Sequence, residues 1–358
     1  MTEPSSTAFW APRAWIGDGI ADHVRIVCDD AGRIASVETD AGALATDTVL
    51  DGVVLPGAVN AHSHAFHRLL RGRTHDGGGS FWTWRELMYR EASRLTPASY
   101  ERIATAVYAE MVAAGWTSVA EFHYVHHTPG GAPYGDAHAM ELALARAARA
   151  TGIRLTLLDT CYLSSGFGAG PTPEQQRFSD GSARRWLDRL AALRARVAQE
   201  FSPDEVLVGA ALHSVRAVPV AELAGVADVL ADEAPLHIHL SEQPAENEAC
   251  LAATGRTPTE LLASFGLLSP RLSAVHATHL TPGDIALLGA AGATIVMCPT
   301  TEADLGDGIG PARRLVDVGC RLALGTDQHA VIDPLLEARA LESGERLASG
   351  ERGRFSPT

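Results

Sequence analysis

Short segments rich in Val, Ile and Leu alternate along most of this chain with longer Ala-, Leu- and Arg-rich stretches of helical period. This alternation is typical of βα units and a parallel sheet. The expected strands are Val53–Phe66, Thr117–Val125, Arg154–Leu163, Val206–Val218, Leu236–Gln243, Leu272–Leu280, Ala293–Pro299 and Arg321–Thr326. The expected helices, several opened by a cap residue or Pro, are Pro97–Ala114, Asp136–Thr151, Ser182–Glu200, Pro219–Glu233 and Pro282–Ala291. Together these elements predict an α/β fold, a (β/α)8 barrel of the TIM type.

The first 52 residues have a different character. From Thr7 to Asp51 they read as short strands broken at Gly17-Asp18-Gly19 and at residues 29–32, a pattern typical of an antiparallel meander. We therefore expect residues 1–52 to be part of a small β-sandwich domain and residues 53–358 to be the barrel. Residues 165–180 are too long and too rich in Gly and Pro for a tight connection, and we interpret them as an active-site loop.

The charge balance excludes two classes of partner. A formal net charge of −14 disfavours nucleic acid and anionic membranes, which need clustered Lys and Arg. The chain shows neither a signal-peptide pattern at its start nor an apolar stretch of about 20 residues, so we expect a cytoplasmic protein with no membrane partner. The five cysteines contain no C-x-x-C pair, and we interpret all of them as ordinary buried thiols.

Histidines and an aspartate lie where three of the expected strands end. His62 and His64 are two residues apart, so on a strand both face one side and can bind one ion. Taken alone, an H-x-H pair is more often two unrelated surface histidines. His239 and Asp327 follow on the fifth and eighth strands, and the carboxyl ends of barrel strands meet at one face. The sequence therefore predicts one zinc ion per chain, with a position left for water.

Further histidines have open interpretations. His276 is either a buried core residue or a general acid or base, and its place at a strand end favours the second role. His123, His126 and His127 form a possible second metal cluster, but we favour roles in the substrate shell or at the surface.

Several motifs carry a family resemblance. The series HSH, HLSE, VHATH and GTD resembles the mononuclear deaminase branch of the amidohydrolase superfamily. Four more blocks are similar to the N-formimino-L-glutamate deiminases of histidine degradation: FWTWRELMYR (81–90), AEFHYVHH (120–127), HSVRAV (213–218) and TEADLGDG (301–308).

The resemblance implies a role for each matching residue. The zinc ligands would be His62, His64, His239 and Asp327; His276 would be the acid or base and Glu242 the proton shuttle, with Asp327 also accepting a proton. The substrate contacts would be Arg85, Tyr124, His213 and Arg216, with His67 standing where the family often has Gln. The implied substrate is small and acidic, and its carboxylates would bind the guanidinium groups of Arg85 and Arg216.

The implied reaction is zinc-dependent hydrolytic deimination of N-formimino-L-glutamate to N-formyl-L-glutamate and ammonia. Two alternatives stay open. One is deamination of a nucleobase or related aminated heterocycle, which favours an aromatic pocket over paired arginines. The other is a truncated, non-catalytic subunit. For Arg85 and Arg216 the alternative is an ion pair at the barrel rim.

Relatives of this kind continue past the eighth strand and return strands to the small β-domain. We therefore expect the small domain to be incomplete, with unpaired strand edges. Such edges favour a homodimer or a mobile N-terminal segment.

Overall fold

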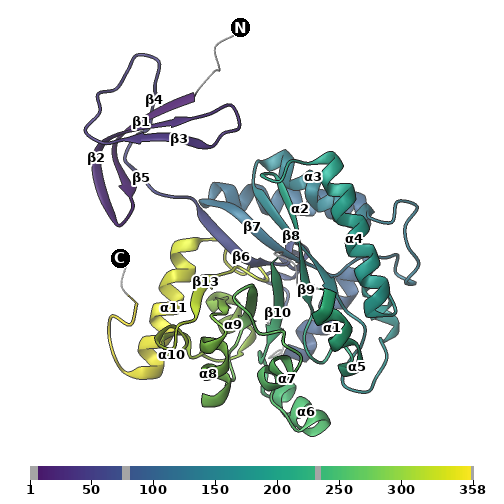
Figure 1. Cartoon of the computed structure of the whole chain (residues 1–358). Helices are drawn as coiled ribbons and strands as arrows, with labels where there is room; N and C mark the ends of the chain where they lie inside the picture. Colours follow the sequence, from purple (N-terminus) through teal and green to yellow (C-terminus); the bar gives the residue numbers. More distant parts are fainter. Residues whose placement is uncertain (1–6, 75–80, 230–234, 356–358) are drawn as a thin grey trace. The chain divides into compact units, whose positions relative to one another are not determined.

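The computed structural model describes residues 7–74, 81–229 and 235–355. They fall into two compact units, one within residues 7–57 and the other within residues 58–355 (Figure 1). In the described residues no helix has the length and apolar character that crossing a membrane requires.

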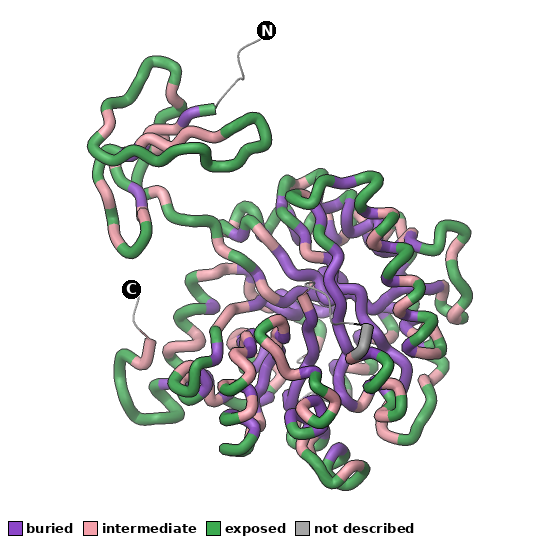
Figure 2. Tube along the Cα trace, in the orientation of Figure 1, coloured by how far each residue is buried: buried purple, intermediate pink, exposed green. Residues whose placement is uncertain are grey.

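The larger unit is the expected barrel. Its eight parallel strands are neighbours in chain order: β6 (Ala58–Ser63), β7 (Trp116–His123), β8 (Arg154–Cys161), β9 (Val206–Leu212), β10 (Leu236–Leu240), β11 (Leu272–His276), β12 (Thr294–Met297) and β13 (Arg321–Leu324). The helices are η1 (Ala65–Leu70), α1 (Phe81–Arg94), α2 (Pro97–Ala113), α3 (Ala139–Thr151), η2 (Pro173–Phe178), α4 (Ala183–Glu200), α5 (Val220–Val229), α6 (Pro244–Thr254), α7 (Pro258–Ser264), α8 (Pro282–Ala290), α9 (Pro299–Leu305), α10 (Ala312–Asp317) and α11 (Pro334–Ser349). Figure 2 shows that the buried residues concentrate in the central strands. The predicted TIM barrel is confirmed.

The first and last barrel strands meet at their carboxyl ends. The backbone N–H groups of Thr326 and Asp327 donate to the carbonyl of His62 at 3.1 and 3.0 Å, and His64 N donates to Asp327 O at 3.1 Å. A Cβ atom on Gly325 would lie 2.7 Å from the Cβ of His62, so only glycine allows this approach. The contact that brings β6 and β13 together therefore also holds three of the expected ligands side by side.

Helix starts follow their cap chemistry. The side chains of Thr96, Ser182, Thr257 and Thr281 each accept a backbone N–H from the first turn of the helix that follows. The helix expected from Asp136 begins at Ala139 instead, because the Asp136 carboxylate accepts the N–H of His138 and forms a turn. The end of the helix expected over Pro219–Glu233 lies outside the described residues.

Several strands are shorter than expected. The strand predicted to reach Leu280 ends at His276, and the one predicted to reach Val218 ends at Leu212. At the end of β11 and just beyond β10 and β13, the backbone takes positive φ values that non-glycine residues rarely adopt. These residues are Ser241 (51°), His276 (67°), Ala277 (50°), Asp327 (43°) and His329 (60°).

The smaller unit is one five-stranded sheet built from β1 (Thr7–Ile16), β2 (Gly19–Cys28), β3 (Ile34–Glu38), β4 (Thr48–Val49) and β5 (Val53–Val54). The antiparallel meander β1-β2-β3 is confirmed, and β4 and β5 pair with β1 in parallel. The prediction of one strand over Val53–Phe66 was wrong: Val53–Val54 belongs to this sheet, and Pro56-Gly57 separates it from β6.

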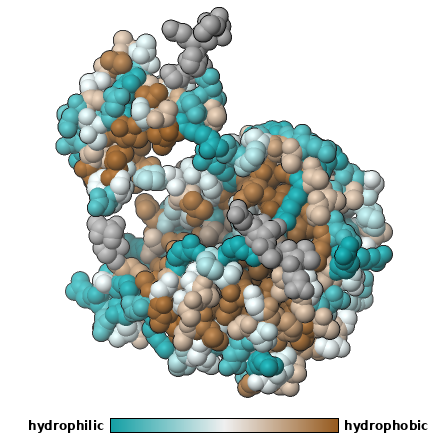
Figure 3. Space-filling model, viewed as in Figure 1, coloured by the Kyte–Doolittle hydropathy of each residue, from teal (hydrophilic) through white to brown (hydrophobic). Residues whose placement is uncertain are grey.

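Apolar side chains remain exposed on the small sheet (Figure 3), among them Ile20, Ile34, Val37 and Val53. Within residues 7–57, no second layer of a sandwich is present. The prediction of five buried thiols was wrong for Cys28, which is only half-buried on β2; the other four cysteines are buried.

Candidate metal and substrate site

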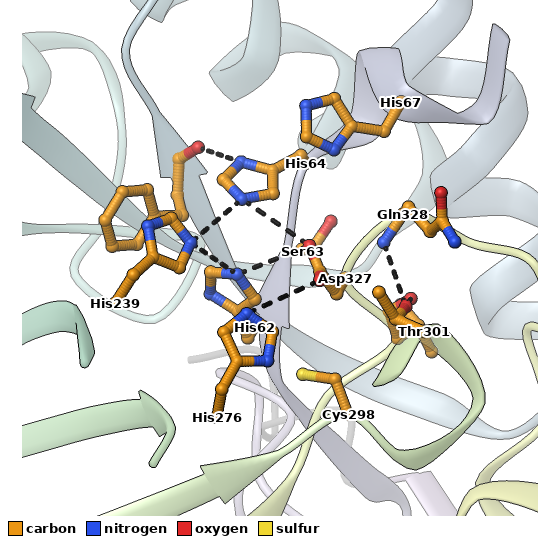
Figure 4. Close-up of polar contacts among 12 residues, drawn as sticks. His62, Ser63, His64, His67, His239, His276, Cys298, Thr301, Asp327 and Gln328 are labelled. Carbon is orange, nitrogen blue, oxygen red and sulfur yellow. Dashed lines mark hydrogen bonds and ion pairs between the residues drawn. The ribbon is translucent and has the colours of Figure 1, made fainter. Parts of the chain in front are cut away.

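Four predicted ligands converge at the carboxyl end of the barrel (Figure 4). The Nε2 atom of His239, on β10, lies 3.2 Å from His62 Nε2 and 3.3 Å from His64 Nε2. Asp327, after β13, places Oδ1 3.5 Å from His62 Nε2 and 3.6 Å from His64 Nε2. All four residues are buried.

The protonation of these imidazoles tests whether they fit a metal ion. His64 Nδ1 donates to the carbonyl of Phe122 and His239 Nδ1 to that of His213, both at 2.8 Å, so in the neutral rings Nε2 carries a lone pair. Burial, with the neighbouring imidazoles, lowers the pKa of His62, His64 and His239 well below its usual range. Lone pairs this close repel one another unless a cation lies between them. Zinc–nitrogen bonds of 2.0–2.1 Å in a tetrahedron separate two nitrogens by ~3.3 Å. The three histidines fit such an ion.

His276 lies beside the ligands with three carboxylates around it. Its Nε2 is 3.8 Å from Glu242 Oε1 and 3.7 Å from Asp327 Oδ2, and its Nδ1 is 3.3 Å from Glu302 Oε1. Burial alone would lower the pKa of His276, but the carboxylates raise it to about 10. Burial raises the pKa of Glu242. The structure therefore brings the predicted acid or base and the predicted proton shuttle to one side of the ligand set.

A buried carboxylate fixes the segment His62–Ala65, which contains the first two predicted ligands. Glu121, on β7, accepts the hydroxyl of Ser63 at 2.5 Å and the backbone N–H of Ala65 at 2.6 Å. Ser63 Oγ also lies 3.2 Å from His329 Nε2, whose Nδ1 is 2.8 Å from Thr326 Oγ1. These contacts fix the residues on either side of His64 and Asp327, as partners beyond the ligands do in known metal sites.

The predicted metal ligands face a narrow cavity that the five predicted substrate contacts also line. Its lining includes His67, Arg85, Tyr124, His213 and Arg216, together with Tyr89, Tyr162, Glu242 and His276. His67 Nε2 lies 2.9 Å from the Tyr124 hydroxyl, and burial lowers the pKa of His67 to about 3. Arg216 Nη1 is buried without a hydrogen-bond partner in the described residues, and Nε is 3.9 Å from Glu246. Arg216 therefore forms a long ion pair with Glu246, while its Nη1 keeps a donor for an anion in the cavity.

The predicted roles of the second histidine cluster were wrong. His123, the last residue of β7, and His126, which follows that strand, are buried and contact Glu141, and neither lines the cavity. His127 bonds Asp180 at 3.0 Å. The signal was present in the sequence: strand residues alternate in direction, so a β7 that turns Phe122 and Tyr124 to the site turns His123 away from it.

Other residues at the site were missed from the sequence. Glu302, in the first turn of α9, contacts His276, and Glu121 holds the H-x-H turn. Tyr89 and Tyr162 line the cavity and share a hydrogen-bond donor, Gln175. Glu302 and Tyr89 lie inside the quoted sequence blocks, which was the available signal. Gln175 lies in the segment interpreted as an active-site loop, where η2 forms.

The fold and the site agree with the similarity of this chain to known proteins. The model of the amidohydrolase family matches residues 53–357, and the chain belongs to this family. It is 42% identical over 353 residues to the formimidoylglutamate deiminase of Pseudomonas aeruginosa, covering 98% of this chain and 77% of that protein. It is 32% identical over 305 residues to the 8-oxoguanine deaminase of the same species, covering 83% of this chain and 65% of that protein.

The crystal structure of an amidohydrolase from Brucella melitensis superimposes with a TM-score of 0.92 at 36% identity, covering 98% of this chain and 78% of that one. The chain is therefore a hydrolase that acts on carbon–nitrogen bonds.

Proposed function

We propose that this enzyme hydrolyses N-formimino-L-glutamate to N-formyl-L-glutamate and ammonia, using one zinc ion per chain. The main observation behind the proposal is a cluster of histidines whose nitrogen atoms are close enough to share one metal ion. The cluster faces a cavity that is also lined by two arginines, Arg85 and Arg216. The similarity to a formimidoylglutamate deiminase at 42% identity supports it.

The ligands in this proposal are His62, His64, His239 and Asp327. When bound, zinc supplies Lewis acidity that makes water nucleophilic near neutral pH. The hydrogen bonds from Nδ1 of His64 and His239 to backbone carbonyls keep both Nε2 atoms available as ligands.

Proton transfer falls to the carboxylates around His276. Water adds to the formimino carbon and the bond to the terminal nitrogen breaks, so that nitrogen must gain two protons to leave as ammonia. Asp327 accepts one proton from water, and Glu242, whose pKa burial raises, holds a second. Both protons go to the departing nitrogen, and the remaining hydroxyl proton returns to Glu242 as the carbonyl group forms. His276, kept protonated by its neighbouring carboxylates, stabilises the negative charge that develops on oxygen.

The arginines provide orientation. A formimino group offers little surface for binding, so the two glutamate carboxylates must hold the substrate in place. Arg85 and Arg216 both line the cavity, and guanidinium groups bind carboxylates with two parallel hydrogen bonds.

Two other functions compete. The 8-oxoguanine deaminase relative at 32% identity favours an aminated heterocycle as the substrate. A non-catalytic subunit is the second alternative. The two arginines favour a dicarboxylate over an uncharged heterocycle, and the intact ligand set favours catalysis over a silent subunit.

The test is ammonia release by the zinc-loaded protein from N-formimino-L-glutamate, with 8-oxoguanine as the competing substrate. We expect release from the first only. Arg216→Met is expected to weaken formiminoglutamate binding by about tenfold or more, since a charge-assisted contact is lost. An analogue without the contacted carboxylate should be affected far less. Release from 8-oxoguanine alone, or no release from either compound, would reject the proposal.

A further inference from the structure

We propose that the cavity between α9 and α11 binds a small aliphatic cation, an ammonium or guanidinium group on a hydrocarbon chain, and that its binding slows turnover by drawing Glu302 away from His276. This cavity is separate from the substrate cavity, the one beside the histidine cluster that Arg85 and Arg216 line. Binding of the cation does not depend on the proposed function, whereas its effect on turnover rests on it.

The cavity has the size of a small-molecule site. Its volume is about 460 Å³, within the range of roughly 300–1,000 Å³ that such sites occupy. It lies between α9, the segment 306–310 that follows, and α11, and Figure 1 shows these two helices side by side. Glu302 and Ala303 of α9 line this cavity, whereas Leu305 of the same helix lines the substrate cavity. Helix α9 therefore forms part of the wall of both.

Most of the wall is apolar. Its large side chains are those of Met297, Ile309, Leu341 and Leu347, and no aromatic ring lines it among the described residues. Ile309 is 49% exposed and Leu347 is 81% exposed. A hydrocarbon chain that covers such side chains removes apolar surface from water, which favours binding. The wall therefore suits an aliphatic ligand and offers no ring on which a planar ligand could stack.

The charged groups of the wall are carboxylates. Among the described residues that line the cavity, Glu302 and Glu345 are the only charged ones, and both are buried. Glu345 accepts the backbone N–H of Arg313 at 2.7 Å and lies 4.0 Å from Arg354 Nε. Glu302 contacts no Arg or Lys side chain within the described part of the chain. A buried carboxylate without such a partner favours a cation.

One oxygen of Glu302 is available to a ligand. Its Oε1 accepts the backbone N–H of Cys298 at 2.8 Å and lies 3.3 Å from His276 Nδ1. Its Oε2 makes no hydrogen bond within the residues that the structure describes. Hydrogen bonds from an ammonium or guanidinium group to a carboxylate are charge-assisted, so a cationic head group is the ligand that this oxygen binds best.

The same carboxylate couples the cavity to the reaction. In the proposed mechanism His276 stabilises the charge that develops on oxygen, and Glu302 is one of the carboxylates that contact it. A cation at Oε2 competes with His276 for Glu302 and loosens that contact. The walls of the substrate cavity keep their own residues, so binding of the cation should lower kcat and leave KM unchanged.

The experiment measures binding to the zinc-loaded enzyme by calorimetry. The probe is n-hexylammonium; hexanoate has the same chain with the opposite charge, and ethylammonium has the same charge on a shorter chain. Glu302→Gln removes the carboxylate charge, and its matched control is Glu248→Gln at an exposed position on α6. Ala340→Phe fills the cavity, and its control is Ala348→Phe, exposed on the same helix and not part of the lining.

We expect n-hexylammonium to bind at least about tenfold more tightly than ethylammonium, since each CH2 group that becomes buried contributes up to about fourfold. Hexanoate should bind at least about tenfold more weakly as well, because it lacks the charge-assisted contact. Glu302→Gln and Ala340→Phe should each weaken n-hexylammonium binding by about tenfold or more. The two controls should stay within about twofold of the parent.

Turnover tests the coupling. Saturating n-hexylammonium should lower kcat for N-formimino-L-glutamate by about fivefold or more and leave KM at its starting value. A raised KM with unchanged kcat would place the cation in the substrate cavity and overturn the inference. Equal affinity for n-hexylammonium and hexanoate, or parent-like binding in Glu302→Gln and Ala340→Phe, would also overturn it. Binding without a change in kcat would overturn the coupling through His276.

The cation site and the proposed function can fail separately. If the parent releases no ammonia from N-formimino-L-glutamate but binds n-hexylammonium in a Glu302-dependent way, the proposed function is wrong and the site is supported. If turnover occurs and the parent does not bind n-hexylammonium, the site is wrong and the function is unaffected.

Discussion

Among the described residues of the barrel, two buried clusters of histidines and carboxylates differ in whether a side chain of the protein already supplies a cation. At the first, His239 Nε2 lies 3.2 Å from His62 Nε2 and 3.3 Å from His64 Nε2, a spacing that fits a metal ion between them. At the second, His123 and His126 contact Glu141 at 3.3 and 2.7 Å, which is also within reach of a metal ion. Proximity of ligand atoms therefore does not distinguish the two sites.

The second cluster already contains its cation. Arg189, on α4, binds Glu141 on α3 at 3.0 Å, Asp159 on β8 at 2.7 Å and Asp180 at 2.9 Å. Burial would lower the pKa of Arg189, but these carboxylates raise it above its usual value. A guanidinium among the carboxylates repels a second cation. The partners of the ligand atoms therefore differ: at the second cluster the carboxylates bind a guanidinium group, whereas at the first the Nε2 atoms of His62, His64 and His239 face one another.

The largest expected effect comes from removing one ligand. His239→Ala should reduce bound zinc from one equivalent to nearly none and activity by at least about 10³-fold, because the Lewis acid is lost. His126→Ala is the matched variant at the second cluster, and it should keep one zinc. Metal analysis of the purified variants checks both; a parent-like zinc content in His239→Ala would contradict the assignment.

The second largest effect is expected from removing the guanidinium group of Arg189 at the second cluster. Arg189→Met leaves three buried carboxylates without their partner and should lower the free energy of unfolding by about 3–5 kcal/mol. Zinc content in the folded fraction should not change. Arg184→Met on the same helix removes an exposed ion pair and should leave stability unchanged within error. Urea unfolding measures the difference, and a stable Arg189→Met variant that gains a second zinc would reverse our reading of this cluster.

A smaller effect is expected at the turn that holds the first cluster. Glu121→Gln keeps one acceptor oxygen, but its NH2 group meets a second donor, either Ser63 Oγ or Ala65 N. The turn should loosen and zinc affinity should fall by roughly 10–100-fold. Glu110→Gln, at an exposed position on α2, is the control. Competition with a chelator gives the affinities, and an unchanged value for Glu121→Gln would mean that the turn is rigid without this carboxylate.

The smallest effect depends on pH. His127 and Arg189 hold the pKa of Asp180 below its usual value, against the opposing effect of burial. A carboxylate with a lowered pKa stabilises the fold above its unfolded pKa of about 3.9, and this contribution is lost as the pH falls further. Asp180→Asn should therefore cost about 1–2 kcal/mol at neutral pH. The gap from the parent protein should narrow below about pH 4, as measured by unfolding across pH; a gap that widens there would show the wrong sign.

The sequence was sufficient for the barrel and for the convergence of His62, His239 and Asp327. Both follow from simple rules, the alternation of strands with helices and the meeting of parallel strands at one face. The bends that end β10, β11 and β13 could not be predicted, because residues such as His276 take a positive φ against their own preference.

Contacts between distant segments of the chain also could not be predicted from the sequence. Gln175 reaches Tyr89 across 86 positions of the chain, and Ser63 reaches Glu121 across 58. Neither pair has a local pattern, since each depends on how η2 or β7 packs against another element. The direction of His123, by contrast, was readable from strand alternation.

The central claim is that one zinc ion, at the cluster of His62, His64, His239 and Asp327, supports hydrolysis of N-formimino-L-glutamate. The most direct measurement adds zinc in steps to the metal-free protein and follows ammonia release from this substrate at each step. Activity is predicted to rise in proportion to zinc and to stop rising at one equivalent per chain. A rise that continues to two equivalents, or full activity before any zinc is added, would contradict the claim.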